Sequence, residues 1–327
     1  MQNINNEEYH YRSVVDSKEK SIPVIRSKKT TSTLGLTSKV SNLVKDNHFT
    51  NDEQLGVRVD KQDTQVLLTV INKIADEPIT PFDLTVHNIV STFYSEEQQY
   101  FTSKQIAQKL IGDKKTKPYK TLITDVEQSL YKMAKTFIGI DHTEQFSNWK
   151  IQDKYEDDQI EANIKMRYML NLDIDLAIKL NNNVVSSFKL NQTPPLLEYS
   201  KIYRQLATTE DKLIDTAGYL THNQDTVAIK YYLKDRIEAF KSIRSRKKKI
   251  NNSDISYKTM YEYLNLQHLL TDRSENRMKF LNHVKNILEA YKNNGFIKSY
   301  KLTHEGSDTT INGKIVIGKI KNNDTYI

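Results

Sequence analysis

One stretch of the chain, Ser256 to Lys319, constrains the fold more than any other. A short helix is expected over Ser256 to Leu264. A polar break follows, and Thr271 to Ser274 offers capping residues for a longer helix that ends near Lys292. Asn294-Gly295 then supplies the left-handed residue that commonly closes a helix. The sequence therefore predicts a short helix, a turn and a long helix.

Two strands are expected after the long helix. Residues alternate from Phe296 to Leu302, turn-forming residues such as Asn312-Gly313 follow, and Lys314 to Ile320 form the second strand. Helix, turn, longer helix and two-stranded ribbon follow one another in a winged helix, whose second helix lies in the DNA major groove. Small α+β domains that bind no nucleic acid show the same pattern, so both interpretations stay open at this point.

The long helix carries the residues expected to read DNA. Its predicted buried stripe consists of Met278, Leu281, Val284, Leu288 and Tyr291. The residues beside that stripe that suit base contacts are Arg273, Asn276, Arg277 and His283. Arginine pairs well with guanine and asparagine with adenine, and Arg277 is the preferred base reader. A phosphate contact, or a surface ion pair with Asp272 or Glu275, is the alternative for Arg277.

Positive charge gathers just before this stretch. The cluster, which contains no acidic residue, consists of Lys241, Arg244, Arg246, Lys247, Lys248 and Lys249. Cations beside a helix-turn-helix are well placed to neutralise phosphates, and Lys314 and Lys319 on the expected ribbon would add backbone contacts. A solvated helix end is the alternative interpretation of such a cluster.

The whole chain has more basic than acidic residues, which favours a polyanionic binding partner. The 327 residues carry a formal net charge of +7. The chain has no cysteine, which excludes disulfides, thiolate zinc sites and a cysteine nucleophile. No apolar run approaches the roughly 18 residues that a membrane span needs, and the N-terminus does not read as a secretory signal. A cytoplasmic protein with no membrane partner is expected.

The first half of the chain repeats this order of parts. Helices are expected over Gln62 to Ile74, Pro81 to about Tyr94, Ser103 to Leu110, and about Tyr119 to Lys135. Thr102 and Gln105 form a capping box before the third of these helices. Phe137 to Asp141 and Ile164 to Leu172 then predict a pair of strands. The basic residues expected to contact phosphates here are Lys114, Lys115, Lys117 and Lys120.

Pro194-Pro195 mark a break between the two halves. Two helices are expected after it, over Leu196 to Leu206 and over Asp225 to about Ile243, and the second leads into the basic cluster. The predicted fold is α+β and mostly helical, with two tandem winged-helix domains. The predicted division is residues 1–55 as a flexible N-terminal arm, 56–192 as the first domain and 193–327 as the second.

Signatures of catalysis are missing from the sequence. It contains no phosphate-binding G-x-x-x-x-G-K-[ST] loop, no H-E-x-x-H motif and no paired histidines for a nicking metal site. His87 and His222 are isolated and are expected to be ordinary core or surface residues. Carboxylates from Asp153 to Glu161 suit magnesium, but a solvated acidic loop is favoured. No enzyme activity, metal or other cofactor is therefore expected.

Several short segments carry a resemblance to a known family. They are Ile79–Asp83, Tyr100–Ile106, Lys117–Pro118 and Phe137–Asp141 in the first half, and Pro195–Tyr199, Ala228–Ile237 and Leu288–Ile297 in the second. With these fold-level patterns, the chain resembles the replication initiator proteins of theta-replicating plasmids and mobile elements of low-GC Gram-positive bacteria. The resemblance implies two winged-helix domains, binding to repeated double-stranded origin DNA, local opening of the duplex, recruitment of host replication proteins, and a homodimer that represses its own promoter.

The leading hypothesis is therefore a non-enzymatic, sequence-specific initiator of replication. A winged-helix transcription regulator with no replication role is the alternative within the same class. A nuclease or recombinase with an unrecognised site is an alternative from another class. An interaction protein, in which one winged helix binds another protein, is a third.

Overall fold

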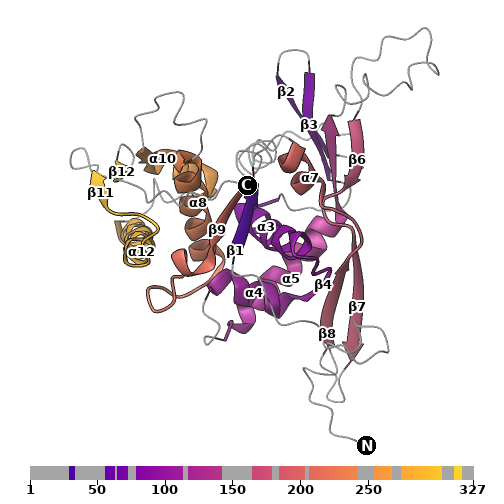
Figure 1. The fold of residues 1–327 in the computed structure, drawn as a ribbon, viewed down its shortest axis with the longest axis horizontal. Coiled ribbons are helices and arrows are strands. Elements are labelled where there is room, and N and C mark those ends of the chain that lie inside the picture. The colour runs from indigo at the N-terminus through magenta and orange to yellow at the C-terminus, as the bar shows by residue number, and fades with distance from the viewer. Residues whose placement is uncertain are drawn as a thin grey trace, which may run out of the picture.

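The structure, a computed structural model, describes residues 29–33, 56–62, 65–72, 79–112, 117–141, 164–178, 184–202, 206–241, 254–266, 274–303 and 313–318. These residues form an α+β fold of helices and small antiparallel sheets (Figure 1). None of the helices that they form is both long enough and apolar enough to cross a bilayer.

Helix α3 (Pro81–Ser95) lies at the centre of the molecule (Figure 1). Thr80 and Asp83 form a reciprocal capping box at its start, and Pro81 occupies a position where its missing N–H costs nothing. Every residue from Pro81 to Phe93 is buried. A helix buried on all sides needs neighbours all round, and these are β1 (Lys29–Thr33), α4 (Ser103–Ile111), α5 (Lys120–Lys135) and α8 (Gln224–Lys241).

The first half continues from α3 through β4 (Tyr100–Thr102), α4 and α5 to a hairpin of β7 (Leu172–Ile178) and β8 (Val184–Leu190). Strand β8 lies between β4 and β7 in one antiparallel sheet. The predicted capping box of Thr102 and Gln105 is confirmed, and α4 ends at Gly112 with a φ of 96°. Strands β5 (Thr136–Asp141) and β6 (Ile164–Tyr168) come between α5 and β7 in the chain, so the order is helix, strand, two helices and four strands, of which the last two share a sheet with β4.

The first half also forms a second sheet, in the strand order β2-β3-β5-β6. Strands β5 (Thr136–Asp141) and β6 (Ile164–Tyr168) pair as predicted, but they join this sheet, and β4 pairs with β8 instead. The predicted helix from Gln62 to Ile74 is wrong, because this segment lies in strands β2 (Gly56–Gln62) and β3 (Gln65–Asn72). Its apolar residues are largely β-branched, and such residues favour a pleated strand when partner strands are present.

The second half begins with α7 (Pro195–Ile202), β9 (Leu206–Glu210) and the 3-10 turn η2 (Asp211–Leu213). Apart from β5 and β6, it then repeats the order of the first half. The repeating elements are α8, β10 (Asp254–Ser256), α10 (Tyr257–Tyr263), α12 (Ser274–Asn293), β11 (Tyr300–Thr303) and β12 (Lys314–Ile317). Strand β12 lies between β10 and β11, as β8 lies between β4 and β7. The two halves therefore share an order of parts, but the ribbon predicted for the first half, Phe137 to Asp141 with Ile164 to Leu172, is not the counterpart of β11 and β12, because β7 and β8 take that place.

Helix α12 ends as the sequence predicts. Gly295 has a φ of 78°, its amide donates to the Lys292 carbonyl at 3.0 Å, and the Phe296 amide donates to the Tyr291 carbonyl at 2.8 Å. This pair of bonds closes the last turn in the Schellman pattern. The prediction that Met278 is buried is wrong, because its side chain is 54% exposed and Phe280 takes the inward position. The buried stripe of α12 consists of Phe280, Val284, Ile287, Leu288 and Tyr291.

Strand β1 lies within the predicted flexible arm, and for this segment the prediction is wrong. All its residues pair with β9 of the second half. The Thr31 amide donates to Thr92 Oγ1 on α3 at 2.9 Å, and Lys109 Nζ on α4 donates to the Lys29 carbonyl at 2.9 Å. The Lys234 ammonium on α8 donates to the Ser32 hydroxyl. The strand therefore ties elements of both halves together.

The two halves share their buried core. One continuous apolar cluster includes α3 residues such as Val86 and Val90, and α8 residues such as Ile229 and Leu233. Ion pairs and hydrogen bonds also cross between the halves, for example from Arg167 on β6 to Glu198 on α7, from Lys109 on α4 to Asp211, and from Thr193 to the Tyr94 hydroxyl.

Candidate nucleic-acid interface

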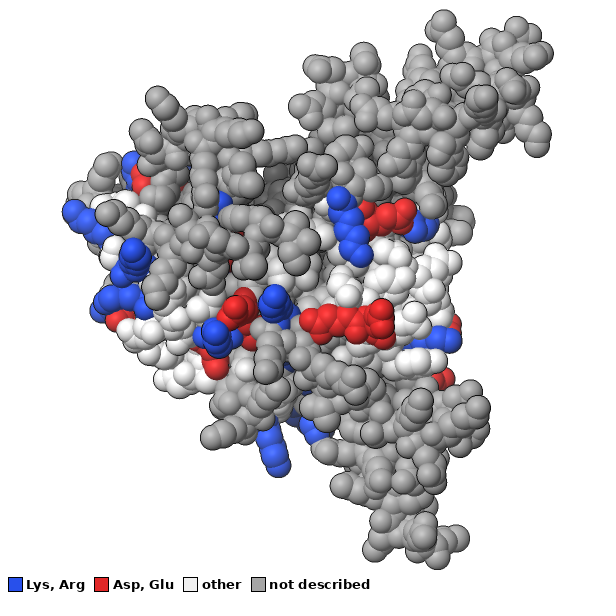
Figure 2. Space-filling model, in the orientation of Figure 1, with Lys and Arg blue, Asp and Glu red and all other residues white. Residues whose placement is uncertain are grey.

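The outward face of α12 is the strongest candidate for a nucleic-acid interface. Met278, Asn282 and Lys285 are exposed and follow one another at steps of four and three residues, so they share one face of the helix. Lys279 lies beside them and pairs with Glu275 at 2.9 Å in a fully exposed setting. Figure 2 shows lysine and arginine side chains along the edge of the molecule where α12, β11 and β12 lie.

The C-terminal part of α12 is anchored, whereas its N-terminal part is open. Asn286 Nδ2 donates to the Tyr219 carbonyl at 3.1 Å, and Asn293 Nδ2 donates to the Tyr219 hydroxyl at 2.7 Å. Asn294 Nδ2 donates to the Asp215 carbonyl at 2.7 Å. These bonds fix the helix to the segment before α8. Helix-turn-helix proteins touch base edges with the N-terminal residues of their second helix, which is the end that this anchoring leaves exposed.

The predicted base readers do not all lie on the outward face. Arg277 is half-buried and lies two turns before Val284, on the side of α12 that faces inward. Its charge partly offsets the effect of burial on the pKa of Tyr261 in α10, which is still raised to about 12. Asn276 is exposed, and His283 is half-buried with a pKa lowered by burial. Arg273 lies outside the described residues.

Sequence reasoning missed Lys279, Asn282 and Lys285 as candidate contacts. It placed Val284, Leu288 and Tyr291 in the buried stripe correctly, but it assigned Met278 to that stripe and so oriented the first turns of the helix wrongly. Phe280, Val284, Ile287 and Tyr291 recur at steps of four, three and four residues and would have given the correct orientation.

Two other predicted contacts already have partners. Lys241 Nζ lies 3.8 Å from the centre of the Phe296 ring and 3.3 Å from Glu238 Oε1, and only 13% of its side chain is exposed. Lys241 is therefore left out of the candidate interface. Lys314 lies 3.6 Å from Asp254 Oδ2 and stays half-exposed, so its ammonium remains accessible. Arg244, Arg246, Lys247, Lys248 and Lys249 lie outside the described residues.

Helix α5 is the counterpart of α12 in the first half. Its exposed face carries Lys120, Thr121, Thr124 and Gln128, and Lys117 is exposed just before it. Lys114 and Lys115 lie outside the described residues. The exposed lysines here, Lys117 and Lys120, equal in number Lys279 and Lys285 on the outward face of α12.

Asp225, the second residue of α8, acts electrostatically on Asp125 of α5 and on His283 in the middle of α12. Burial, and secondly the charge of Asp225, raises the pKa of Asp125 on α5. The same carboxylate partly offsets the lowering of the His283 pKa on α12. Since Asp225 acts electrostatically on both helices, the two counterpart helices approach the same region of the molecule.

A buried lysine joins the halves behind these helices. Lys230 Nζ donates to the carbonyls of Leu110 and Ile111 at 2.8 and 3.2 Å, which caps the C-terminal end of α4 from α8. Burial lowers the pKa of Lys230 to about 8, against the opposing charges of Asp215 and Asp211. Because its protons are used by main-chain carbonyls inside the protein, Lys230 serves the structure and not a ligand.

The burial of Lys230 predicts a pH dependence of stability. Between pH 8 and about 10 the unfolded chain keeps a proton on this lysine that the folded protein has released, so a higher pH favours folding. The gain is at most about 1.4 kcal/mol per pH unit, and above pH 10 the ionisation of tyrosines in the unfolded chain opposes it. Urea unfolding at pH 7, 8 and 9 should show this rise in the unmodified protein and not in Lys230→Met. Equal slopes in the two proteins would contradict it.

Histidines and carboxylates form no metal-binding cluster among the described residues. No group of three or more potential ligands occurs there. Burial lowers the pKa values of His87 and His222 to about 4, and His222 Nε2 lies 3.0 Å from the Thr216 hydroxyl. Both rings are therefore neutral core residues. The acidic residues 153–161 lie outside the described residues.

Known proteins provide no direct parallel for this chain. No protein-family model, no curated protein and no solved structure matches it.

Proposed function

We propose that this protein binds double-stranded DNA in a sequence-specific way, through two winged-helix units. The observation that carries the proposal is the repeated set of a helix, a strand, two helices and a final hairpin, with that strand paired to the last strand of the hairpin in both halves. In the first half, β5 and β6 are inserted before the hairpin. In this proposal α5 and α12 are the recognition helices. The β7–β8 and β11–β12 hairpins are the wings, which reach the flanking backbone.

The outward face of α12 supplies contacts of the appropriate chemistry. Asn282 is able to pair with adenine in the major groove, and Lys279 and Lys285 to contact phosphates on either side. The Glu275–Lys279 pair does not oppose this, because a fully exposed ion pair contributes little and a phosphate readily replaces it. The anchored C-terminal part holds the helix in a fixed orientation, which favours specific over diffuse binding.

The resemblance noted in the sequence extends this proposal to replication. We propose an initiator that binds repeated origin sites, promotes local opening and recruits host replication proteins, acting without catalysis. A transcription regulator without a replication role is the second candidate. Footprints on direct repeats near an AT-rich tract are expected for the initiator, and a single palindrome over a promoter for the regulator.

Salt-dependent binding tests the proposed interface. The double variant Lys279→Ala/Lys285→Ala should bind its selected duplex more weakly. The slope of log affinity against log salt should become shallower by about 1.8, at about 0.9 per lost phosphate contact. Lys212→Ala, which removes a 77% exposed lysine away from α12, is the matched control and should keep the slope. An unchanged slope in the double variant would remove this face of α12 from the interface.

Asn282 tests base reading separately from phosphate contacts. Asn282→Ala should cost about 1–3 kcal/mol of binding free energy at the selected site and relax the preference at one base pair. Arg277→Ala should relax no single position, because Arg277 lies on the inward side of α12. Affinities for a full set of single-base variants of the site measure both. If Asn282→Ala lost the same affinity for every DNA variant, Asn282 would contact the DNA backbone and not a base. If Arg277→Ala lost the preference for one base pair, Arg277 would be a base reader after all.

A further inference from the structure

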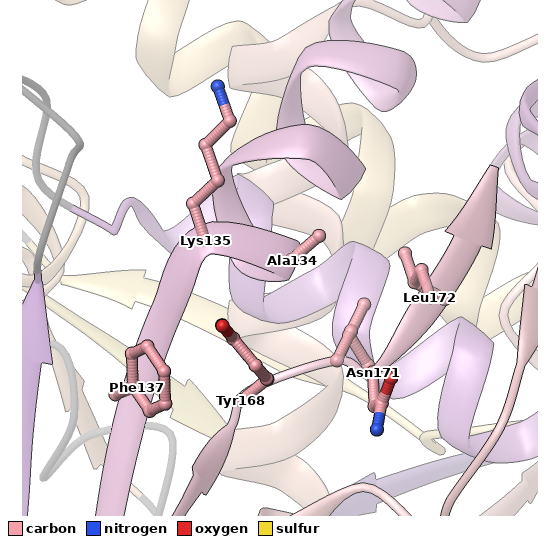
Figure 3. Close-up of a pocket in the computed structure, with 7 residues that line it drawn as sticks. Ala134, Lys135, Phe137, Tyr168, Asn171 and Leu172 are labelled. Atoms are coloured by element: carbon pink, nitrogen blue, oxygen red, sulfur yellow. The ribbon is translucent and has the colours of Figure 1, made fainter.

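A pocket of about 350 Å³ opens where the C-terminal end of α5 meets β5, β6 and the start of β7 (Figure 3). Leu170 and Leu172 form part of its wall, the rings of Phe137 and Tyr168 form another part, and Lys135 and Asn171 add polar groups. This volume lies within the range of pockets that hold small organic groups. The pocket lies at the C-terminal end of α5, and none of the side chains proposed above to contact the duplex lines it.

The two rings form an accessible aromatic surface. Phe137 and Tyr168 are directly opposite each other on β5 and β6, with ring centres 4.0 Å apart and planes at 38°. Tyr168 is 42% exposed, and Met166, two residues earlier on the same side of β6, is 38% exposed. Large exposed apolar side chains are few among the described residues, so two on one short strand beside a pocket indicate a binding surface.

The polar groups around the rings define the ligand further. Lys135 lines the pocket at the end of α5 and is exposed, and Figure 3 shows its amine directed away from the two rings. The side-chain amide of Asn171 lies on the other side of Tyr168 (Figure 3) and offers both a donor and an acceptor. Arg167 of β6 is engaged with Glu198. A planar ligand with hydrogen-bonding edges and a negative charge on one side fits this arrangement.

We propose that this pocket binds an unpaired base of single-stranded DNA. The base stacks on Tyr168 and Phe137, and Lys135 contacts the adjoining phosphate. The inference goes beyond duplex binding and does not depend on it, because the pocket and the outward face of α12 use different residues. A peptide with an apolar side chain would use the walls of the same pocket, but it would leave the Lys135 cation without a function.

Binding of labelled single-stranded oligothymidine to the full chain, followed by fluorescence anisotropy, tests the proposal. Tyr168→Ala should weaken this binding about 5- to 150-fold, which corresponds to the loss of one stacked base. Tyr168→Phe keeps the ring and should bind as the unmodified protein does. An equally long strand of abasic sites carries the same phosphates and should bind weakly to all three proteins. Ultraviolet crosslinking should join thymine to Tyr168 or Phe137.

Each outcome supports or overturns the proposal. Equal binding of oligothymidine and the abasic strand, or no effect of Tyr168→Ala, would overturn it. Loss of binding in Tyr168→Phe would overturn the stacking role of the ring. Thermal unfolding of each variant distinguishes loss of the site from loss of the fold, and Tyr168→Ala should remain folded with a slightly lower melting temperature because it loses the ring contact with Phe137. Duplex binding measured in the same variants should be unaffected, so failure of this site and failure of duplex recognition give different results.

Discussion

Removal of residues 1–36, which include β1, should destabilise the folded protein by about 3–5 kcal/mol. The strand accepts hydrogen bonds from the ammonium groups of Lys109 and Lys234 and donates one from Thr30 to the Asp211 carboxylate at 2.8 Å. Bonds to charged groups contribute about 1.5–3 kcal/mol each, and water that reaches the vacated groups offsets part of the loss. Urea unfolding measures the change, and the melting temperature should fall by about 10 °C or more.

A shorter deletion is the matched control for this prediction. Removal of residues 1–26 leaves β1 in place and, if the rest of the arm is flexible as the sequence predicts, should leave stability unchanged. Ser32→Ala isolates one contact, because it removes the hydroxyl that the buried Lys234 ammonium bonds. It should cost about 1–3 kcal/mol. If the proteins lacking residues 1–36 and residues 1–26 had the same free energy of unfolding, β1 would not contribute to stability.

The elements with strong local signals were predictable from the sequence. Thr80 and Thr102 cap α3 and α4 because each is followed three residues later by a side chain that completes a capping box. Gly295 ends α12 because glycine adopts the left-handed conformation without strain. These features depend on neighbours within one helical turn, which the sequence displays directly.

Features that depend on distant partners were not predictable. Strand β1 has the sequence Lys-Thr-Thr-Ser-Thr and no apolar periodicity, and its partners lie 61 to 202 residues away. Strand β3 was mistaken for a helix because its apolar run fits both periods and only its pairing with β2 and β5 decides. The N-terminal turns of α12 were oriented wrongly, since Met278 and Phe280 are both acceptable core residues and tertiary packing chose Phe280.

Separation of the chain at the predicted domain boundary should leave neither half stable. Helix α3 of the first half is buried on all sides and packs against α8 of the second. In α8, Val227, Ile229, Leu233 and Ile237 are buried, and burial of such a side chain contributes about 1.5–3 kcal/mol. Loss of even half of this contribution is about 3–6 kcal/mol, a large part of the roughly 5–15 kcal/mol that stabilises a typical domain.

Fragments 1–192 and 193–327 test this prediction. Each fragment alone should aggregate or fail to unfold cooperatively, because it exposes the apolar face that the other covers. Produced together, they should copurify in equal amounts, and Lys230→Met in the second fragment should weaken their association because the carbonyls of Leu110 and Ile111 lose their donor. A cooperative unfolding transition in either isolated fragment would show that the boundary separates independent domains. In that case the shared core would be a contact between two stable units, and each recognition helix could be studied on its own half of the DNA site.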